Sequence, residues 1–195
     1  MSSSLRKLTL LALALPAVLA LAACGNAHSR VTTGTYAGES GANAPYLNVG
    51  PLTYEVQISR ELNPYNNEDA QYLQGLEGAA AKLEYGEEWF AVFLQVYNHS
   101  NVPLPASEQI SIYDTQGNTY SPIVPNSSNP FAYRGGTVPA NSLLPEPGTI
   151  ANQVGSQGQV LLFKIQIVSL DNRPIEIKIV DPSNPRLYAR AELDV

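Results

Sequence analysis

Between residues 51 and 195, hydrophobic and polar residues alternate in the pattern of β-strands. Between Tyr54 and Ser59 every second residue is apolar, which predicts a strand with one face in the core and one face in water. Between Trp89 and Tyr97 apolar residues occupy both sides, so this segment is expected at the centre of a sheet that is covered on both faces. Further strands are expected at 110–113, 119–123, 160–168, 175–180 and 189–195.

Turn residues and helix-breaking glycines separate these segments. The stretch 114–118 contains Gly117 and Asn118, which adopt a positive φ readily and close a hairpin. The only helical pattern lies at 67–83, where Gly75 and Gly78 interrupt it, so no more than two turns are expected there. Strands without alternating helices predict an all-β fold, an antiparallel β-sandwich of about seven strands.

The N-terminus has the layout of an export signal. Two basic residues, Arg6 and Lys7, precede an apolar run from Leu8 to Leu21. The small residues Ala22 and Ala23 follow, as they do ahead of a cleavage point. A retained membrane-spanning helix needs about 20 apolar residues, and this run is shorter.

The four residues Leu21-Ala22-Ala23-Cys24 resemble the lipobox of bacterial lipoprotein precursors. This resemblance implies that residues 1–23 are removed and that Cys24 carries a diacylglycerol. It places the protein at the outer face of the cell membrane. Residues 24–50 are rich in Gly, Ser, Thr, Asn and Ala and predict a lipidated cysteine followed by a flexible, disordered linker. Residues 51–195 are then expected to form the folded domain.

Several motifs of this domain are similar to those of a known family. They are the Tyr-x-Val-x-Ile strand, the Trp-Phe-Ala-Val-Phe-Leu-Gln-Val strand, the Asp-Thr-Gln-Gly-Asn turn and the segment Gly158–Phe163. Together they resemble the telokin-like, immunoglobulin-like domains of bacterial extracellular lipoproteins. That family also resembles a secreted mycobacterial immunoprotective antigen. The resemblance implies an immunoglobulin-like β-sandwich of unknown function and supplies no catalytic residue.

Composition removes several classes of function. The chain has a net charge of −6, and loss of the signal peptide would make it −8, so no nucleic-acid partner is expected. The single cysteine excludes an internal disulfide. The only histidines are His28 and His99, and the only methionine is Met1, which leaves too few ligands for copper or structural zinc. No cofactor and no catalytic residue are predicted.

One short loop has the oxygen ligands that Ca²⁺ prefers. Asn63, Asn66 and Asn67 precede Glu68 and Asp69, which are weak calcium candidates. The same residue types also form turns and helix caps, and this loop precedes the helical segment. The capping interpretation is the favoured one.

The segment 121–158 is longer than a structureless loop inside a compact domain usually is. Within it Phe131, Tyr133 and Arg134 combine two aromatic side chains with an arginine, the residue types that dominate protein interfaces. They are candidates for a partner-binding loop. Alternatively, the two aromatic residues pin the loop onto the edge of the sandwich.

These observations predict a non-enzymatic lipoprotein that is bound to the membrane through the diacylglycerol on Cys24. It would bind an envelope protein or a glycan. In an alternative hypothesis the protein binds a solute or a glycan beneath the 121–158 loop, which acts as a lid. A hydrolase that uses carboxylates alone is a third, weaker hypothesis.

Overall fold

Twelve β-strands, one short α-helix and three 3-10 helices make up the part of the chain that the computed structural model describes, residues 29–32, 46–153 and 158–193. The helices are α2 (Asn67–Ala70), η1 (Gly78–Ala81), η2 (Ile150–Asn152) and η3 (Ile167–Asp171). The strands are β1 (Ser29–Thr32), β2 (Tyr46–Val49), β3 (Leu52–Leu62), β4 (Glu87–Asn98), β5 (Leu104–Ala106), β6 (Ile110–Tyr113), β7 (Thr119–Tyr120), β8 (Gly136–Val138), β9 (Ser142–Leu144), β10 (Gln159–Gln166), β11 (Ile175–Val180) and β12 (Tyr188–Leu193). None of the described helices is long and apolar enough to cross a membrane.

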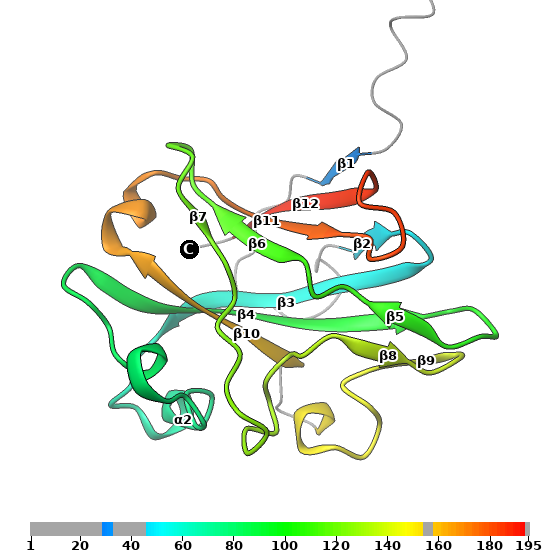
Figure 1. Cartoon of the computed structure of the whole chain (residues 1–195), viewed down its shortest axis with the longest axis horizontal. Coiled ribbons are helices and arrows are strands. Elements are labelled where there is room, and N and C mark those ends of the chain that lie inside the picture. The colour runs from blue at the N-terminus through cyan, green and yellow to red at the C-terminus, as the bar shows by residue number, and fades with distance from the viewer. Residues whose placement is uncertain (1–28, 33–45, 154–157, 194–195) are drawn as a thin grey trace, which may run out of the picture.

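The strands form two packed sheets and a small ribbon (Figure 1). Sheet I has the order β1-β12-β11-β6-β7, and sheet II has the order β10-β4-β3-β2 with β9 also paired to β4. The ribbon is β5 with β8. All paired strands are antiparallel except β1 and β12, so the predicted immunoglobulin-like antiparallel sandwich is confirmed. The predicted number of about seven strands is too low. Among the strands that the prediction lacks, β5, β8 and β9 have only three residues each and no alternating pattern.

The main core lies between the two sheets. Sheet I contributes the alternate positions Ile175, Ile177 and Ile179, which are buried, while Glu176 and Lys178 between them are partly exposed. Sheet II contributes the side of β4 that carries its even-numbered apolar residues, Phe90, Val92, Leu94 and Val96. The period-two pattern of the sequence therefore identified which side chains meet between the sheets.

A second core covers the other face of β4. Trp89, Ala91 and Phe93 point away from sheet I and pack against Tyr72 and Phe131. The Tyr72 ring meets Phe93 edge-on at 4.9 Å between centroids. This confirms the prediction of a central strand that is buried on both faces. The helical segment is also as short as expected, since α2 has four residues and a separate 3-10 turn follows it.

The prediction that β3 has a water-facing side is wrong. Its polar residues Glu55, Gln57 and Ser59 are all buried. A bulge between Val56 and Ile58 shifts the register against β4 and sends Ile58 to the second core instead of the first. Glu55 is buried with a partner, because the Tyr97 hydroxyl donates a hydrogen bond to it.

The folded domain begins before Pro51, which corrects the predicted end of the linker. Strand β2 pairs with β3, and its side chains Leu47 and Val49 lie in the main core. Strand β1 pairs in parallel with β12. The sequence did not predict β1 and β2, because both are short strands in a Gly- and Ser-rich stretch and neither has an extended apolar pattern. Cys24 and residues 33–45 of the predicted linker lie outside the described residues.

Leu47→Ala tests whether β2 belongs to the domain. Because Leu47 is fully buried, we expect the truncation to lower the free energy of unfolding by about 2 to 5 kcal/mol, measured by urea denaturation. Leu83→Ala is the matched control, since Leu83 is 37% exposed and should lose less than about 1 kcal/mol. Equal losses in the two variants would show that β2 does not contribute to the core.

Candidate functional site

The segment predicted as a long loop contains regular structure. It holds β8, β9 and η2, and single bridges pair Ile123 with Leu162 and Ala132 with Val160. Residues 122–134 thus run beside the outer edge of β10 and are hydrogen-bonded to it. The described part of this segment is fastened to the sandwich, and this does not support its use as a lid.

Phe131 and Tyr133 are buried, which corrects their prediction as partner-binding residues. Phe131 packs edge-on against Tyr72 in the second core, at 5.2 Å between ring centroids. Tyr133 lies in the main core and donates a hydrogen bond of 2.7 Å to the carbonyl of buried Ser107. Both aromatic residues hold the segment in place, as the alternative interpretation proposed.

Arg134 is exposed, but its guanidinium group is engaged within its own loop. It donates hydrogen bonds to the carbonyl oxygens of Pro125, Asn126 and Asn129. The amide of Asn129 in turn donates to the carbonyls of Tyr72 and Gln74. The predicted role of Arg134 as a binding residue is therefore corrected to that of a group that closes the 125–129 turn.

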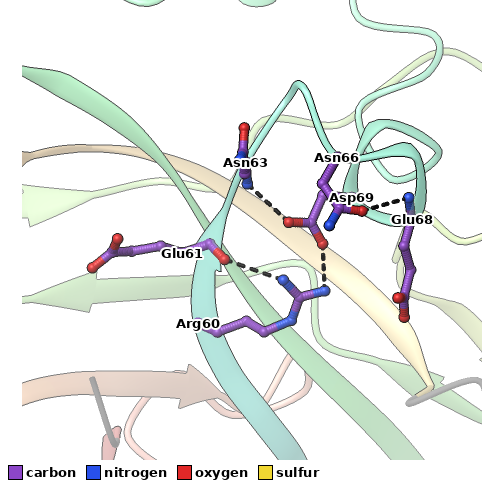
Figure 2. A network of polar contacts seen from close by, with 6 residues as sticks. All are labelled: Arg60, Glu61, Asn63, Asn66, Glu68 and Asp69. Carbon is purple, nitrogen blue, oxygen red and sulfur yellow. Dashed lines mark hydrogen bonds and ion pairs between the residues drawn. The ribbon is translucent and has the colours of Figure 1, made fainter.

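The calcium candidates form an ion pair and a helix cap (Figure 2). Asp69 lies 2.6 Å from the Arg60 guanidinium group and accepts a 2.9 Å hydrogen bond from the backbone N–H of Asn63. The side-chain oxygen of Asn66 caps α2 by accepting from the Glu68 amide. Figure 2 shows the Glu68 carboxylate pointing away from Asp69. The structure thus assigns the loop to capping, the favoured interpretation.

The pKa of Asp69 reflects this pairing. Burial alone would raise it, but hydrogen bonds from Arg60 and from the backbone N–H of Asn63, with the charge of Arg60, lower it below its usual value. Among the described residues, no three His, Cys, Asp or Glu side chains come together in a group that could hold a metal ion.

Two shallow hollows meet at Glu108, and we call them together the Glu108 groove. The first has a volume of about 310 Å³ and is lined, besides Glu108, by Pro122, Val124, Tyr133, Arg134, Gly135 and Leu161. The second has a volume of about 410 Å³ and is lined, besides Glu108, by Pro105, Ala106, Gln109, Gly136, Thr137 and Pro182. Residues of the β5–β8 ribbon line the second hollow, and Arg134 and Gly135, which precede β8, line the first.

Glu108 is the charged group that the groove offers to a ligand. Its carboxylate is exposed, and no described residue forms a hydrogen bond or an ion pair with it. The side chain lies over Gly135, which has a φ of +65° and would bring a Cβ to 2.5 Å from the Glu108 Cγ. Glycine at this position therefore leaves room for the glutamate between the two hollows.

Sequence reasoning missed Glu108 because nothing in its local pattern distinguishes it from a solvated surface acid. The groove is built from three stretches of chain, 105–109, 122–124 and 133–137, and from two single residues, Leu161 and Pro182. Tyr133 and Arg134 do line it, but Tyr133 is buried, and the guanidinium group of exposed Arg134 is hydrogen-bonded within its own loop.

The groove lacks the arrangement that acid–base chemistry needs. It holds one carboxylate, whereas carboxylate hydrolases use two on opposite sides of a bond. Elsewhere, burial and the nearby Glu61 raise the pKa of Glu88, but neither acid lines the groove. His99 is exposed and stacks on Tyr97, and within the described residues no hydrogen bond joins it to a serine.

Tyr133→Phe tests the buried role of this side chain. The substitution leaves the Ser107 carbonyl without its donor in the core, so we expect the free energy of unfolding to fall by about 1 to 3 kcal/mol in urea denaturation. Tyr85→Phe removes a hydroxyl from a fully exposed ring and should change it by less than about 0.5 kcal/mol. If Tyr133→Phe were as mild as the control, the hydroxyl would not support the loop.

Asp69→Asn tests the ion pair through its pH dependence. At neutral pH we expect a loss of about 1.5 to 3 kcal/mol in the free energy of unfolding, because a charged hydrogen bond is removed. Since the folded pKa of Asp69 is lowered, its contribution is complete above the unfolded pKa of about 3.9 and disappears as the pH falls through the folded value.

The difference between Asp69→Asn and the unmodified chain should therefore shrink in acid, whereas exposed Glu68→Gln should show little effect at either pH. A rise in melting temperature with added Ca²⁺ that Asp69→Asn abolishes would instead assign this loop to a cation.

Comparison with protein-family models and with curated proteins finds no match. Among the solved structures that are similar to the chain are three of bacterial proteins. A candidate lipoprotein (ycdA) from Bacillus subtilis has 10% identity and a TM-score of 0.46, and the match covers 80% of this chain and 39% of that protein. The yjhA protein from Bacillus subtilis has 8% identity and a TM-score of 0.45, with 77% and 96% covered. An uncharacterized β-sandwich protein from Clostridium difficile has 10% identity and a TM-score of 0.43, with 79% and 93% covered. The telokin-like resemblance and its mycobacterial link stay predictions.

Proposed function

We propose that the protein is a lipid-anchored, non-enzymatic binding module at the outer face of the cell membrane. Its ligand is an extended segment of an envelope protein that carries a basic side chain. The observation that carries this proposal is the Glu108 groove, two adjoining hollows with one unpaired carboxylate where they meet.

The shape of the groove favours a chain segment over a small solute. Each hollow is shallow and near the lower limit of volumes that hold small molecules, about 300 Å³. An occupant that fills both hollows must pass over Glu108. Pro105, Pro122 and Pro182 line the groove with rigid apolar surface, which loses little conformational freedom when a ligand binds.

The charge of the groove favours a basic ligand. Arg134 also lines it, but three carbonyl oxygens already accept hydrogen bonds from its guanidinium group. The Glu108 carboxylate is therefore the group that can form a new charge-assisted hydrogen bond. The negative net charge of the whole protein also favours a basic partner.

The alternatives have less support. Residues 122–134 are held to β10 and to residues 72–75 by hydrogen bonds, and two buried aromatic side chains add to this, so a lid over a solute would have to break this packing. A hydrolase would need a second acid or a base beside Glu108. The membrane anchor depends on the lipobox-like sequence ending at Cys24.

Short peptides test the groove directly. Extended peptides with a central lysine between proline and valine residues should bind more tightly than the same peptides with a central glutamate, as measured by fluorescence anisotropy. Glu108→Gln removes the charge and should weaken lysine-peptide binding about three- to tenfold.

Glu146→Gln is the matched control, because Glu146 is an exposed acid outside the groove. Equal binding of the lysine and glutamate peptides, or equal weakening by both variants, would contradict the proposed ligand.

A further inference from the structure

The groove and the start of β1 lie at the same end of sheet I. Strand β1 begins at Ser29, which pairs with Tyr188 at the beginning of β12. Tyr188 pairs with Val180 at the end of β11, and the backbone N–H of Val180 donates to the carbonyl of Gln109. Gln109 lines the second hollow of the groove. Figure 1 shows the turn from β11 to β12 beside the start of β1 at this end.

The register of sheet I gives the distance between the two places. Three strand-to-strand steps separate Ser29 from Gln109. Neighbouring strands lie about 4.8 Å apart, so the Cα atoms of these residues are about 15 Å apart. Pro182, which follows β11, lines the same hollow. The groove therefore lies near the end of the domain at which the chain enters β1.

The path from β1 to the proposed acyl anchor is short. Five Cα–Cα steps separate Ser29 from Cys24, and five residues of fully extended chain span at most about 18 Å. Together with the distance across sheet I, this limit keeps Gln109 within about 33 Å of the Cys24 Cα. A linker ending at residue 50 would have 26 steps and would allow roughly 94 Å.

The groove by itself favours a weak contact. Both hollows are shallow, and Glu108 is exposed to solvent, where a single charge pair contributes little to affinity. Two molecules that are tethered close together meet at an effective concentration in the millimolar range, and this compensates for a weak contact. A groove of this kind, held close to a membrane, therefore binds most effectively a partner that is held in the same membrane.

We propose that the segment bound in the Glu108 groove belongs to a protein embedded in the membrane that holds the acyl chains, and that its basic residue lies within about ten residues of the bilayer. This inference rests on the proposed function, both the lipid anchor and the basic ligand. Ten residues of extended chain span at most about 36 Å, which covers the distance that the tether and sheet I allow. A longer segment would also reach the groove, but its effective concentration there falls with its length.

The test uses the full-length acylated protein in phosphatidylcholine vesicles. The probe is a peptide with a central lysine between proline and valine residues. It is free in solution, or joined to a lipid of the same vesicle by about ten or about 40 Gly and Ser residues. A donor fluorophore at exposed Ser127→Cys and an acceptor on the peptide report binding by energy transfer. Acylation blocks the Cys24 thiol, so only the introduced cysteine is labelled.

We expect the peptide on the short spacer to bind most tightly and the free peptide to bind most weakly. Counted together, the tether and the spacer grow from about 15 to about 45 residues between the two lipid-joined peptides. Because the effective concentration falls as about the −3/2 power of this length, binding should weaken about fivefold.

A longer tether on the protein should have the matching effect. Inserting 17 Gly and Ser residues after Asn26 lengthens the path from Cys24 to Ser29 from five to 22 steps and leaves β1 unchanged. Binding of the peptide on the short spacer should then weaken about threefold, whereas binding of the free peptide should stay the same.

Releasing β1 tests whether its pairing sets the tether length. Arg30→Pro with Val31→Pro removes two backbone donors of β1 and should detach it from β12. The next strand, β2, begins at Tyr46, which is also 22 steps from the acylated residue, so the same threefold loss is expected. Ala27→Pro with His28→Pro is the matched control, because it leaves the β1 backbone donors in place and should cause no loss.

The levels of the proposal fail in different ways. If the free lysine peptide binds no better than its glutamate counterpart, the groove ligand and this inference are both overturned. If cells fed a fatty-acid analogue label Cys24→Ser as strongly as the unmodified chain, the anchor and this inference are overturned. If the free peptide binds and the protein is acylated, but spacer and tether length do not change binding, the membrane-embedded partner alone is overturned in favour of a soluble envelope protein.

Discussion

Strand β4 buries side chains on both of its faces, so apolar surface from other parts of the chain must cover each face. Sheet I covers one face. The other is covered by the α2 segment, through Tyr72, and by the segment after β7, through Phe131. The long connection between β7 and β10 is therefore part of the core, and its aromatic residues are used for packing. Because the aromatic residues of this connection are buried, it is its surface residues, such as Val124, that line the groove.

Prolines in this connection limit the hydrogen bonds that its backbone can form, and polar side chains supply partners instead. The amide of Asn98 donates to the carbonyls of Val102, Val138 and Pro139 from a buried position at the end of β4. Asn129 and Arg134 do the same at the other end of the connection. These few side chains keep an irregular segment in one conformation, which gives the Glu108 groove walls that are fixed before a ligand binds.

Charge is distributed differently over two parts of the surface. The Glu108 carboxylate lies in the groove, and no described residue forms a hydrogen bond or an ion pair with it. On the outer face of sheet I, Lys178 and Arg190 lie beside Glu176 and Glu192, so the charges of β11 and β12 balance there. The groove therefore offers an unbalanced charge, and this face of β11 and β12 does not.

The sequence by itself determined the fold class, the strand at 89–97 that is buried on both faces, the hairpin turn at 114–118 and the shortness of the helix. Each of these depends on period, length and turn residues, which are local properties. Tertiary structure decided that Phe131 and Tyr133 are buried, that Asp69 pairs with Arg60, that Leu47 belongs to the core and that Glu108 stands in a groove. Burial and pairing depend on which distant segments come to lie against a residue, and the β3 bulge shows that one extra residue is enough to change the face on which a side chain lies.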